Sequence, residues 1–267
     1  MANYYSKIAA AWHDATGPAG GPFKKYVLND ELLARIGSID GKAILELGAG
    51  NGYFVRLMMT RKSGERPARL VVTDAAGALL RIAEQCFRVR VAEYRQLDAR
   101  RPYPFESGTF DLILATMVFN ELGDAGLRAA LAECTRVLGS TGRLLATVLH
   151  PDFVERLKEN GQVKPLGHGF YTIPGPGALR VPVVPRSPAG YESLLSAAGF
   201  RFTATAVHPD RRVLRERPGL RHAAGLPLGL VYDCTKLAPT TNGHSTHQAP
   251  AAGRTRLRVP GAHERHP

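Results

Sequence analysis

The residues best suited to chemistry in this sequence lie in a glycine-rich stretch from 46 to 52, which reads Glu-Leu-Gly-Ala-Gly-Asn-Gly. An apolar run at 43–47 leads into it, and Phe54, Leu57 and Met58 follow at helical spacing, so a strand, a turn and a helix are predicted. Glycine allows a tight turn and lets a ligand approach the backbone, while the start of the helix offers free N–H groups. The stretch therefore predicts a ligand-binding turn, although a glycine-rich turn alone does not identify the ligand.

The residues around this turn argue against two common nucleotide motifs. A dinucleotide-binding fingerprint requires glycine at position 53, where this chain has Tyr53. The Lys-Ser/Thr pair of a phosphate-binding loop is also missing. A nicotinamide-dependent dehydrogenase, which shares the fold class, is therefore disfavoured.

Polar residues follow the next predicted strands at the edge where open α/β sheets bind ligands. Asp74 ends the strand at 70–73, where its carboxylate could accept both hydroxyls of a ribose. Asp98 follows the strand that ends at Leu97 and could accept from an adenine amino group. Thr116 and Met117 close the strand at 110–115.

Taken in this order, with the Arg-Val-Leu at 136–138 and Gly142 before the next strand, these motifs resemble the class I S-adenosylmethionine-dependent methyltransferases. The similarity is to their small-molecule, Rossmann-like branch and covers roughly residues 4–200. It implies S-adenosylmethionine as the cofactor and methyl transfer as the reaction. It further implies that the glycines line the methionine part, that Asp74 holds the ribose, and that Asp98 bonds the adenine amino group between flanking Leu79 and Ala99. The cofactor-binding residues expected from it are Glu46, Gly48, Gly50, Gly52, Asp74, Ala75, Leu79, Asp98, Ala99, Thr116 and Met117.

Strands and helices alternate along most of the chain, which predicts a parallel sheet covered by helices on both faces. The fold class expected is an α/β Rossmann-like three-layer sandwich whose mostly parallel sheet has an antiparallel last strand. The resemblance implies that last strand, and residues 230–234 are its candidate. Asp124 is expected to cap the helix that carries Leu127 and Leu131. The remaining strands are expected at 43–47, 70–73, up to Leu97, and at 110–115, 143–149 and 200–207.

One domain is expected over residues 1–236, since a chain of 267 residues with 44% hydrophobic residues can bury one sizeable core. Residues 1–36 are predicted to be N-terminal lid helices. Residues 151–187 are rich in proline and glycine and are predicted to be an irregular, substrate-facing insertion. The polar tail at 237–267 has no apolar period and is predicted to be disordered. The substrate and lid residues expected are Tyr4, Tyr5, Trp12, Phe119 and Phe153.

A general base is needed if the methyl acceptor is a hydroxyl or an ammonium group. His150 is the catalytic candidate, because it directly follows the strand at 143–149 at the ligand-binding edge. Aromatic faces near the lid could stabilise the sulfonium cation. Phe153, Phe170 and Tyr171 suggest an apolar, aromatic small molecule or a biosynthetic intermediate as the acceptor.

The net charge of +12 raises the alternative of an RNA or tRNA methyltransferase, since 201–230 holds six arginines against two acids. Nucleic acid is nevertheless disfavoured, because no RNA-binding module is visible. Residues 115–120 also lack the Asn/Asp-Pro-Pro-Tyr typical of nucleic-acid amino methylation. A second alternative, a non-catalytic cofactor-binding regulator, is disfavoured by the intact glycine motif and Asp74.

The cellular compartment is predicted from what the sequence lacks. No stretch reaches the roughly 18 apolar residues of a membrane span, and no secretory signal is visible, so a cytoplasmic protein without membrane contact is expected. Cys86, Cys134 and Cys234 match neither a disulfide nor a metal pattern. We expect all three to be buried, reduced thiols, and we expect no bound metal.

Overall fold

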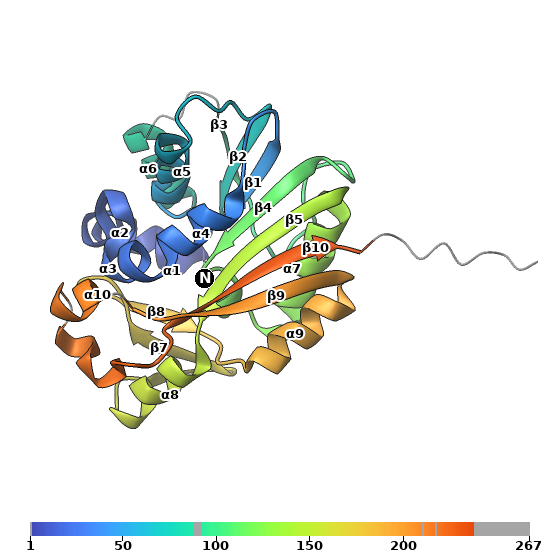
Figure 1. Ribbon diagram of the computed structural model, residues 1–267. Helices are drawn as coiled ribbons and strands as arrows, with labels where there is room; N and C mark the ends of the chain where they lie inside the picture. The colour runs from blue at the N-terminus through green and yellow to red at the C-terminus, as the bar shows by residue number, and fades with distance from the viewer. Residues whose placement is uncertain (1, 88–91, 210, 217, 238–267) are drawn as a thin grey trace, which may run out of the picture. The chain divides into compact units, whose positions relative to one another are not determined.

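The computed structural model describes residues 2–87, 92–209, 211–216 and 218–237, and a seven-stranded sheet forms its centre (Figure 1). The strand order is β3-β2-β1-β4-β5-β10-β9, with parallel pairing from β3 to β5. β10 runs antiparallel to both β5 and β9, so the predicted fold class with its antiparallel last strand is confirmed. The strands are β1 (Ala43–Leu47), β2 (Arg69–Asp74), β3 (Ala92–Gln96), β4 (Phe110–Thr116), β5 (Leu138–Leu149), β9 (Phe200–Val207) and β10 (Gly229–Lys236).

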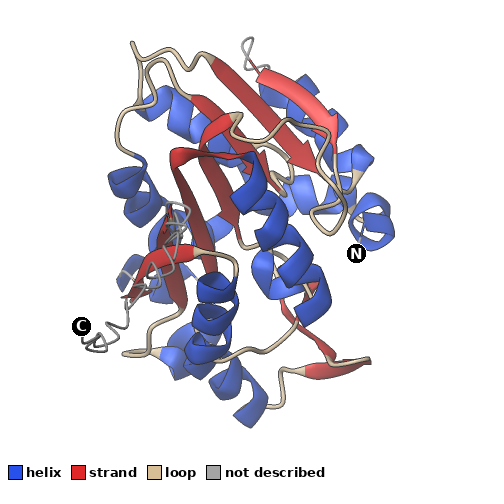
Figure 2. Ribbon diagram, turned by 90° about the vertical axis from the view of Figure 1, so that its right-hand side faces the viewer, coloured by secondary structure: helices blue, strands red, loops and turns tan. Residues whose placement is uncertain are grey.

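Helices cover both faces of this sheet, as the views in Figures 1 and 2 show. The central strands are buried almost throughout, which is typical of a parallel sheet between two helical layers. Two large apolar clusters follow from this, one on each face. The first face carries α4 (Asn29–Ile36), α5 (Tyr53–Arg61) and α6 (Gly77–Phe87), and the second carries α7 (Asp124–Val137) and α9 (Pro188–Ala197).

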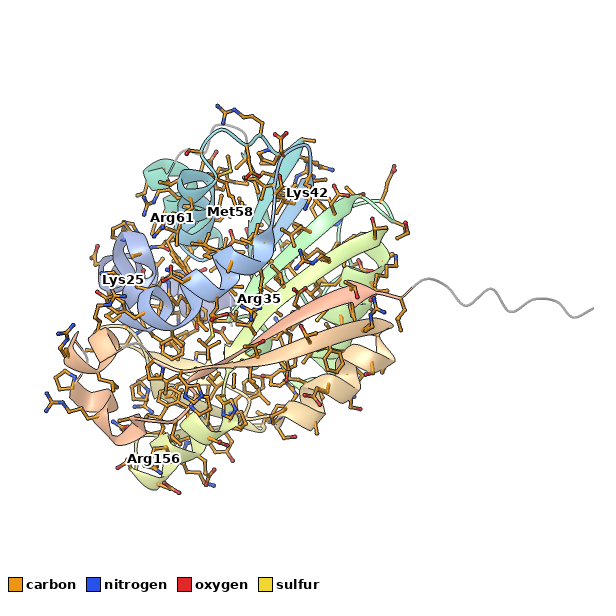
Figure 3. All side chains as sticks on the ribbon, in the orientation of Figure 1. Lys25, Arg35, Lys42, Met58, Arg61 and Arg156 are labelled. Atoms are coloured by element: carbon orange, nitrogen blue, oxygen red, sulfur yellow. The ribbon has the colours of Figure 1, made fainter. Side chains whose placement is uncertain are left out.

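Helix α4 belongs to the core, although the sequence placed it among the lid helices of residues 1–36. Leu32 and Ile36 are fully buried in the first apolar cluster. Arg35, labelled in Figure 3, donates from Nη2 to Thr205 Oγ1 of β9 at 3.1 Å, and its carbonyl accepts from Arg143 Nη2 of β5 at 3.0 Å. The elements before α4 are α1 (Ala2–Lys7), α2 (Ala9–Thr16), η1 (Gly17–Ala19), α3 (Gly21–Phe23) and the π-helix η2 (Lys24–Leu28).

The segment 151–187 is regular, contrary to the irregular insertion that its composition predicted. Pro151 and Pro188 each start a helix, a position where the missing N–H costs nothing. Between these helices lies a three-stranded antiparallel sheet, which tolerates proline in its short strands. The segment comprises α8 (Pro151–Glu159), β6 (Lys164–Gly167), β7 (Phe170–Pro174) and β8 (Arg180–Val183), and the remaining elements are η3 (Phe119–Glu121), α10 (Arg211–Glu216) and η4 (Pro218–Ala223).

Two smaller expectations are wrong. The residue at the N-cap of α7 is Gly123, and Asp124 is the first helical residue, where its carboxylate accepts from Arg186 Nη2 at 2.6 Å. Cys86 is exposed, because the buried stripe of α6 ends at Ala83, one turn earlier.

Cys134 and Cys234 are buried free thiols, as predicted. The sequence predicts a disordered tail at 237–267, and residues 238–267 lie outside the described part of the chain. Within the described residues, no helix is both long and apolar enough to cross a membrane.

The burial of α4 leads to a stability prediction. Leu32→Ala should lower the free energy of unfolding by about 2–5 kcal/mol, because it removes a fully buried side chain and leaves a cavity. The measurement is urea denaturation followed by circular dichroism. Leu166→Ala is the control, since Leu166 is 56% exposed and its truncation should change the free energy by less than about 0.5 kcal/mol. Equal effects of the two substitutions would contradict the placement of α4 in the core.

Candidate active site

A cavity of about 270 Å³ opens at the carboxyl ends of β1, β2 and β4. In the sheet, β1 has β2 on one side and β4 on the other. The chain first adds β2 and β3 on one side of β1 and then adds β4 on the opposite side, so the strand order reverses at β1. Connections that depart in opposite directions leave a crevice at such a switch point, where open α/β sheets bind ligands. Lining residues come from the ends of these strands, from the N-terminal helices and from the 151–187 segment.

The glycine turn forms one wall of the cavity, and its shape depends on glycine at two positions. Gly48 has φ 62°, and a β-carbon there would lie 2.3 Å from Val118 Cγ2. Gly50 has φ 60°, and a β-carbon there would lie 3.6 Å from Trp12 Nε1. Other residues are strained at such positive φ values, so glycine keeps this wall open to a ligand.

Asp74 fixes the turn to the end of β2. Its Oδ2 accepts from the Gly50 N–H at 2.8 Å, and its Oδ1 accepts from the Ala76 N–H at 2.7 Å. The side chain lines the cavity and is nearly buried. Burial raises the pKa of Asp74, while the two backbone hydrogen bonds oppose that rise. Each carboxylate oxygen keeps a further lone pair, so Asp74 can still accept hydrogen bonds from a ligand diol.

The next wall contains the residues predicted to surround an adenine ring. Leu79 and Ala99 are buried and line the cavity together with Asp98. Asp98 is already engaged, because Arg100 donates to it from Nη2 at 2.6 Å and from its backbone N–H at 3.0 Å. These bonds to Arg100 hold the pKa of Asp98 below its usual range.

The end of β4 contributes a strained residue and an unused hydroxyl. Met117 has φ 63°, a conformation that costs energy in a residue with a side chain. Its N–H donates to the carbonyl of Thr147 at 3.0 Å and to Thr147 Oγ1 at 3.1 Å, which holds the strained turn. The neighbouring Thr116 Oγ1 is buried at the cavity without a hydrogen-bond partner among the described residues. Strain and an unsatisfied polar group together are typical of a binding site.

Two glutamates near the cavity have strongly perturbed acidities. Burial raises the pKa of Glu46 to about 8, and Glu46 Oε2 has no hydrogen-bond partner within the described structure. Burial also raises the pKa of Glu121 to about 8, and repulsion from Asp74 adds to that rise. Glu121 lines the cavity, whereas Glu46 lies behind it.

The N-terminal helices form a further wall of the cavity. Tyr5 of α1 packs against Ala76 and Leu79, and its hydroxyl donates to Glu121 Oε1 at 2.7 Å. The rings of Tyr5 and Trp12 meet edge to face with centroids 5.2 Å apart. The hydroxyl of Tyr4, which does not line the cavity, donates to the carbonyl of Arg180 in β8. Helix α1 is thereby attached to both η3 and β8 of the 151–187 segment.

The structure brings most of the predicted site residues together around one cavity and leaves a few outside it. His150 is among the latter: its Nδ1 accepts from the Asp152 N–H at 3.2 Å and caps α8, and burial lowers its pKa. A catalytic His150 therefore stays a prediction. The predicted residues that line the cavity are Tyr5, Trp12, Gly48, Gly50, Asp74, Ala75, Leu79, Asp98, Ala99, Thr116, Met117 and Phe153, and those that do not are Tyr4, Glu46, Gly52, Phe119 and His150.

The sequence interpretation missed several polar lining residues, among them Lys24, Asn120 and Glu121. Asn120 and Glu121 directly follow the strand end that was considered, so extending that edge by one turn would have found them. Lys24 had no local signal, because its neighbours in the cavity come from distant parts of the chain. Among the residues that the structure describes, no cluster of three or more His, Cys, Asp or Glu side chains could hold a metal ion.

Comparison with known proteins agrees with this geometry. Residues 45–146 match the family described as "Methyltransferase domain". The chain is 32% identical over 130 residues to malonyl-[acyl-carrier protein] O-methyltransferase 1 of Coxiella burnetii, covering 48% of this chain and 42% of the relative. It is 31% identical over 120 residues to demethylmenaquinone methyltransferase of Thermotoga maritima, covering 44% of this chain and 48% of the relative. The matches thus span less than half the length of either relative.

A solved structure extends the likeness to the whole fold. An S-adenosylmethionine-dependent methyltransferase from Mesorhizobium loti superposes with a TM-score of 0.61 over 82% of this chain and 100% of its own. The identity is 17%, so this likeness concerns the fold.

The raised pKa of Glu46 leads to a prediction for stability against pH. Between about pH 4.5, where an unfolded glutamate ionises, and pH 8, the folded protein holds a proton that the unfolded chain has released. The free energy of unfolding should therefore fall as pH rises through this window. Glu46→Gln removes this contribution, so its stability relative to the parent protein should rise by about 1–3 kcal/mol from pH 6 to pH 8.

The measurement is urea denaturation at both pH values. Glu93→Gln is the matched control, because hydrogen bonding to Arg69 holds the pKa of Glu93 below its usual range and both states are ionised throughout. A constant difference between Glu46→Gln and the parent protein would contradict the raised pKa.

Proposed function

We propose that this chain, whose residues 45–146 form a methyltransferase domain within a class I fold, is an S-adenosylmethionine-dependent methyltransferase with a small-molecule acceptor. The observation that supports this most is the carboxylate of Asp74, held against the Gly50 N–H at the base of the cavity. This hydrogen bond brings the glycine turn and the acid at the end of β2, the two main parts of the sequence motif, together in one wall of the cavity. A non-catalytic regulator would need the same cofactor-binding wall. It would not need the apolar half of the cavity that residues of the 151–187 segment line.

The chemistry of the lining residues fits this cofactor. Asp74 offers acceptors for ribose hydroxyls, and the apolar Leu79 and Ala99 suit the faces of an adenine ring. Thr116 Oγ1, which has no partner within the described chain, adds a polar contact at the end of β4. The glycine wall leaves room beside the turn that side chains would fill. When bound, S-adenosylmethionine supplies an electrophilic methyl group on a sulfonium.

The task of the protein in such a reaction is chiefly alignment. Holding two reactants in line can supply about 7–11 kcal/mol of the barrier. Tyr5 and Trp12 of the N-terminal helices cover one side of the cavity, and the Tyr5–Glu121 hydrogen bond fixes this cover to η3. Glu121 is the half-buried carboxyl that could take a proton from the acceptor at Oε1 or Oε2.

The half of the cavity that belongs to 151–187 supports an apolar acceptor. Phe153 stacks on Phe23 with ring centroids 6.1 Å apart, and Leu157, Ile173 and Val181 continue this surface. An enclosed apolar surface of this size suits a small aromatic or aliphatic molecule better than a nucleic acid. The relatives from Coxiella and Thermotoga carry names with small or carrier-bound acceptors, which agrees with this proposal.

Calorimetry with S-adenosylhomocysteine tests the proposed cofactor. The parent protein should bind it with micromolar affinity and should not bind NADH. Asp74→Asn should weaken binding about 10–100-fold, because the introduced amide group opposes the Gly50 N–H and one charged acceptor is lost. Asp111→Asn is the control, since Asp111 also accepts a backbone N–H, from Ala43, but lies at the other end of β4. A parent protein that ignores S-adenosylhomocysteine would refute the proposal.

The pH dependence of turnover tests which residue accepts the proton. With a hydroxyl or amine acceptor found by screening, kcat/KM should rise with pH through about 8 as Glu121 ionises. Glu121→Gln should lower kcat/KM about 10²–10⁴-fold and abolish this rise, whereas His150→Ala should preserve it. A rise centred below pH 6.5 that disappears in His150→Ala would assign the proton to His150 instead, since burial lowers the pKa of that ring.

A further inference from the structure

Lys24 lies in the cavity beside the glycine turn and is not used by the sequence motif. It is the first residue of η2, a π-helix, and this rare helical form often occurs at functional sites. Its Nζ lies 5.0 Å from the centroid of the Tyr53 ring and 6.0 Å from that of Trp12. Tyr53 follows the last glycine of the turn, and Trp12 Nε1 approaches Gly50. The ammonium is therefore held between two aromatic rings next to the turn.

The charge of Lys24 has no directional partner in the described structure. Burial lowers its pKa, and the carboxyls of Glu121, Glu46 and Asp74 oppose that effect from a distance. No oxygen of the described residues lies within ion-pair or hydrogen-bond distance of Nζ, and its close contacts are the two ring faces. An ammonium group has three N–H donors, and Lys24 lines the cavity, so these donors are available to an acceptor on a bound ligand.

The other cation of the cavity wall is already neutralised. Arg100 also lines the cavity, and it forms an ion pair with Asp98. Among the described lining residues, Lys24 is thus the cation whose hydrogen-bond donors are unused. Its contacts with Tyr53, which follows the glycine turn, and with Trp12, which approaches Gly50, place it on the side of the cavity that the turn forms.

We propose that Lys24 binds the carboxylate of the amino-acid part of the cofactor, an inference that rests on the proposed function. That carboxylate is the single anionic group of S-adenosylmethionine. The cation–π contacts with Tyr53 and Trp12 hold the ammonium in place, so little side-chain freedom is lost when the ligand binds. Lys24 would then select ligands that carry the amino-acid carboxylate over adenosine thioethers without it.

Calorimetry with two ligands that differ in this group tests the inference. The first is S-adenosylhomocysteine, and the second is its decarboxylated analogue, 5′-S-(3-aminopropyl)-5′-thioadenosine, which keeps the ammonium. Lys24→Met should weaken binding of the first about 10–100-fold, the effect of losing a charge-assisted hydrogen bond. It should leave binding of the analogue unchanged or tighter, because a positive charge near the ammonium is removed. Lys24→Arg should retain most of the preference for the carboxylate.

Lys25→Met is the matched control, since Lys25, labelled in Figure 3, is the exposed neighbour and does not line the cavity. It should leave both affinities unchanged. An equal loss of both ligands in Lys24→Met would overturn the inference, because the lysine would then only shape the cavity. Unchanged binding of S-adenosylhomocysteine would overturn it as well. A parent protein that binds neither ligand would refute the proposed function itself, a result distinct from the other two.

Discussion

The hydrogen bond from the Gly50 N–H to Asp74 is the interaction on which the rest of the site depends. It joins the turn after β1 to the end of β2, two neighbouring strands whose carboxyl ends meet at the switch point of the sheet. The second oxygen of the same carboxylate accepts from Ala76 and so fixes the start of α6 as well. One buried acid thus sets the relative positions of a strand, a turn and a helix, and the cavity wall follows from that arrangement.

Several buried titratable groups lie around the cavity. Glu46, Asp74, Glu121 and Lys24 act on one another around the cavity, and desolvation pushes each toward its neutral form. Unpaired charges of this kind reduce stability, and proteins keep them mainly where a ligand interacts with them. The Tyr5–Glu121 hydrogen bond shows how the cover over the cavity relies on the same set of groups.

The sequence predicted those features that depend on local patterns. The strands at 43–47 and 200–207 were predicted with their observed bounds, because short apolar or alternating runs end there at glycine or polar residues. The methyltransferase resemblance is confirmed, since it rested on motifs at the strand ends. Tertiary contacts decided the rest. Proline at 151 and 188 starts helices instead of breaking structure, and Glu121 meets Tyr5 from 116 residues away, so no local pattern could reveal these roles.

The position of β10 also bears on how the protein is made. Within the described residues, β9 joins the sheet solely through β10, which is the last of the described strands to be synthesised. Leu230, Tyr232 and Cys234 of β10 complete the second apolar cluster. Until residues 229–236 have left the ribosome, β5 has an unpaired edge and α9 and β9 have no sheet to join. An exposed edge of this kind pairs readily with other chains. A nascent chain stalled before residue 229 would therefore be a target for chaperones, even though every residue of the glycine turn and of the strand ends around the cavity had already been made.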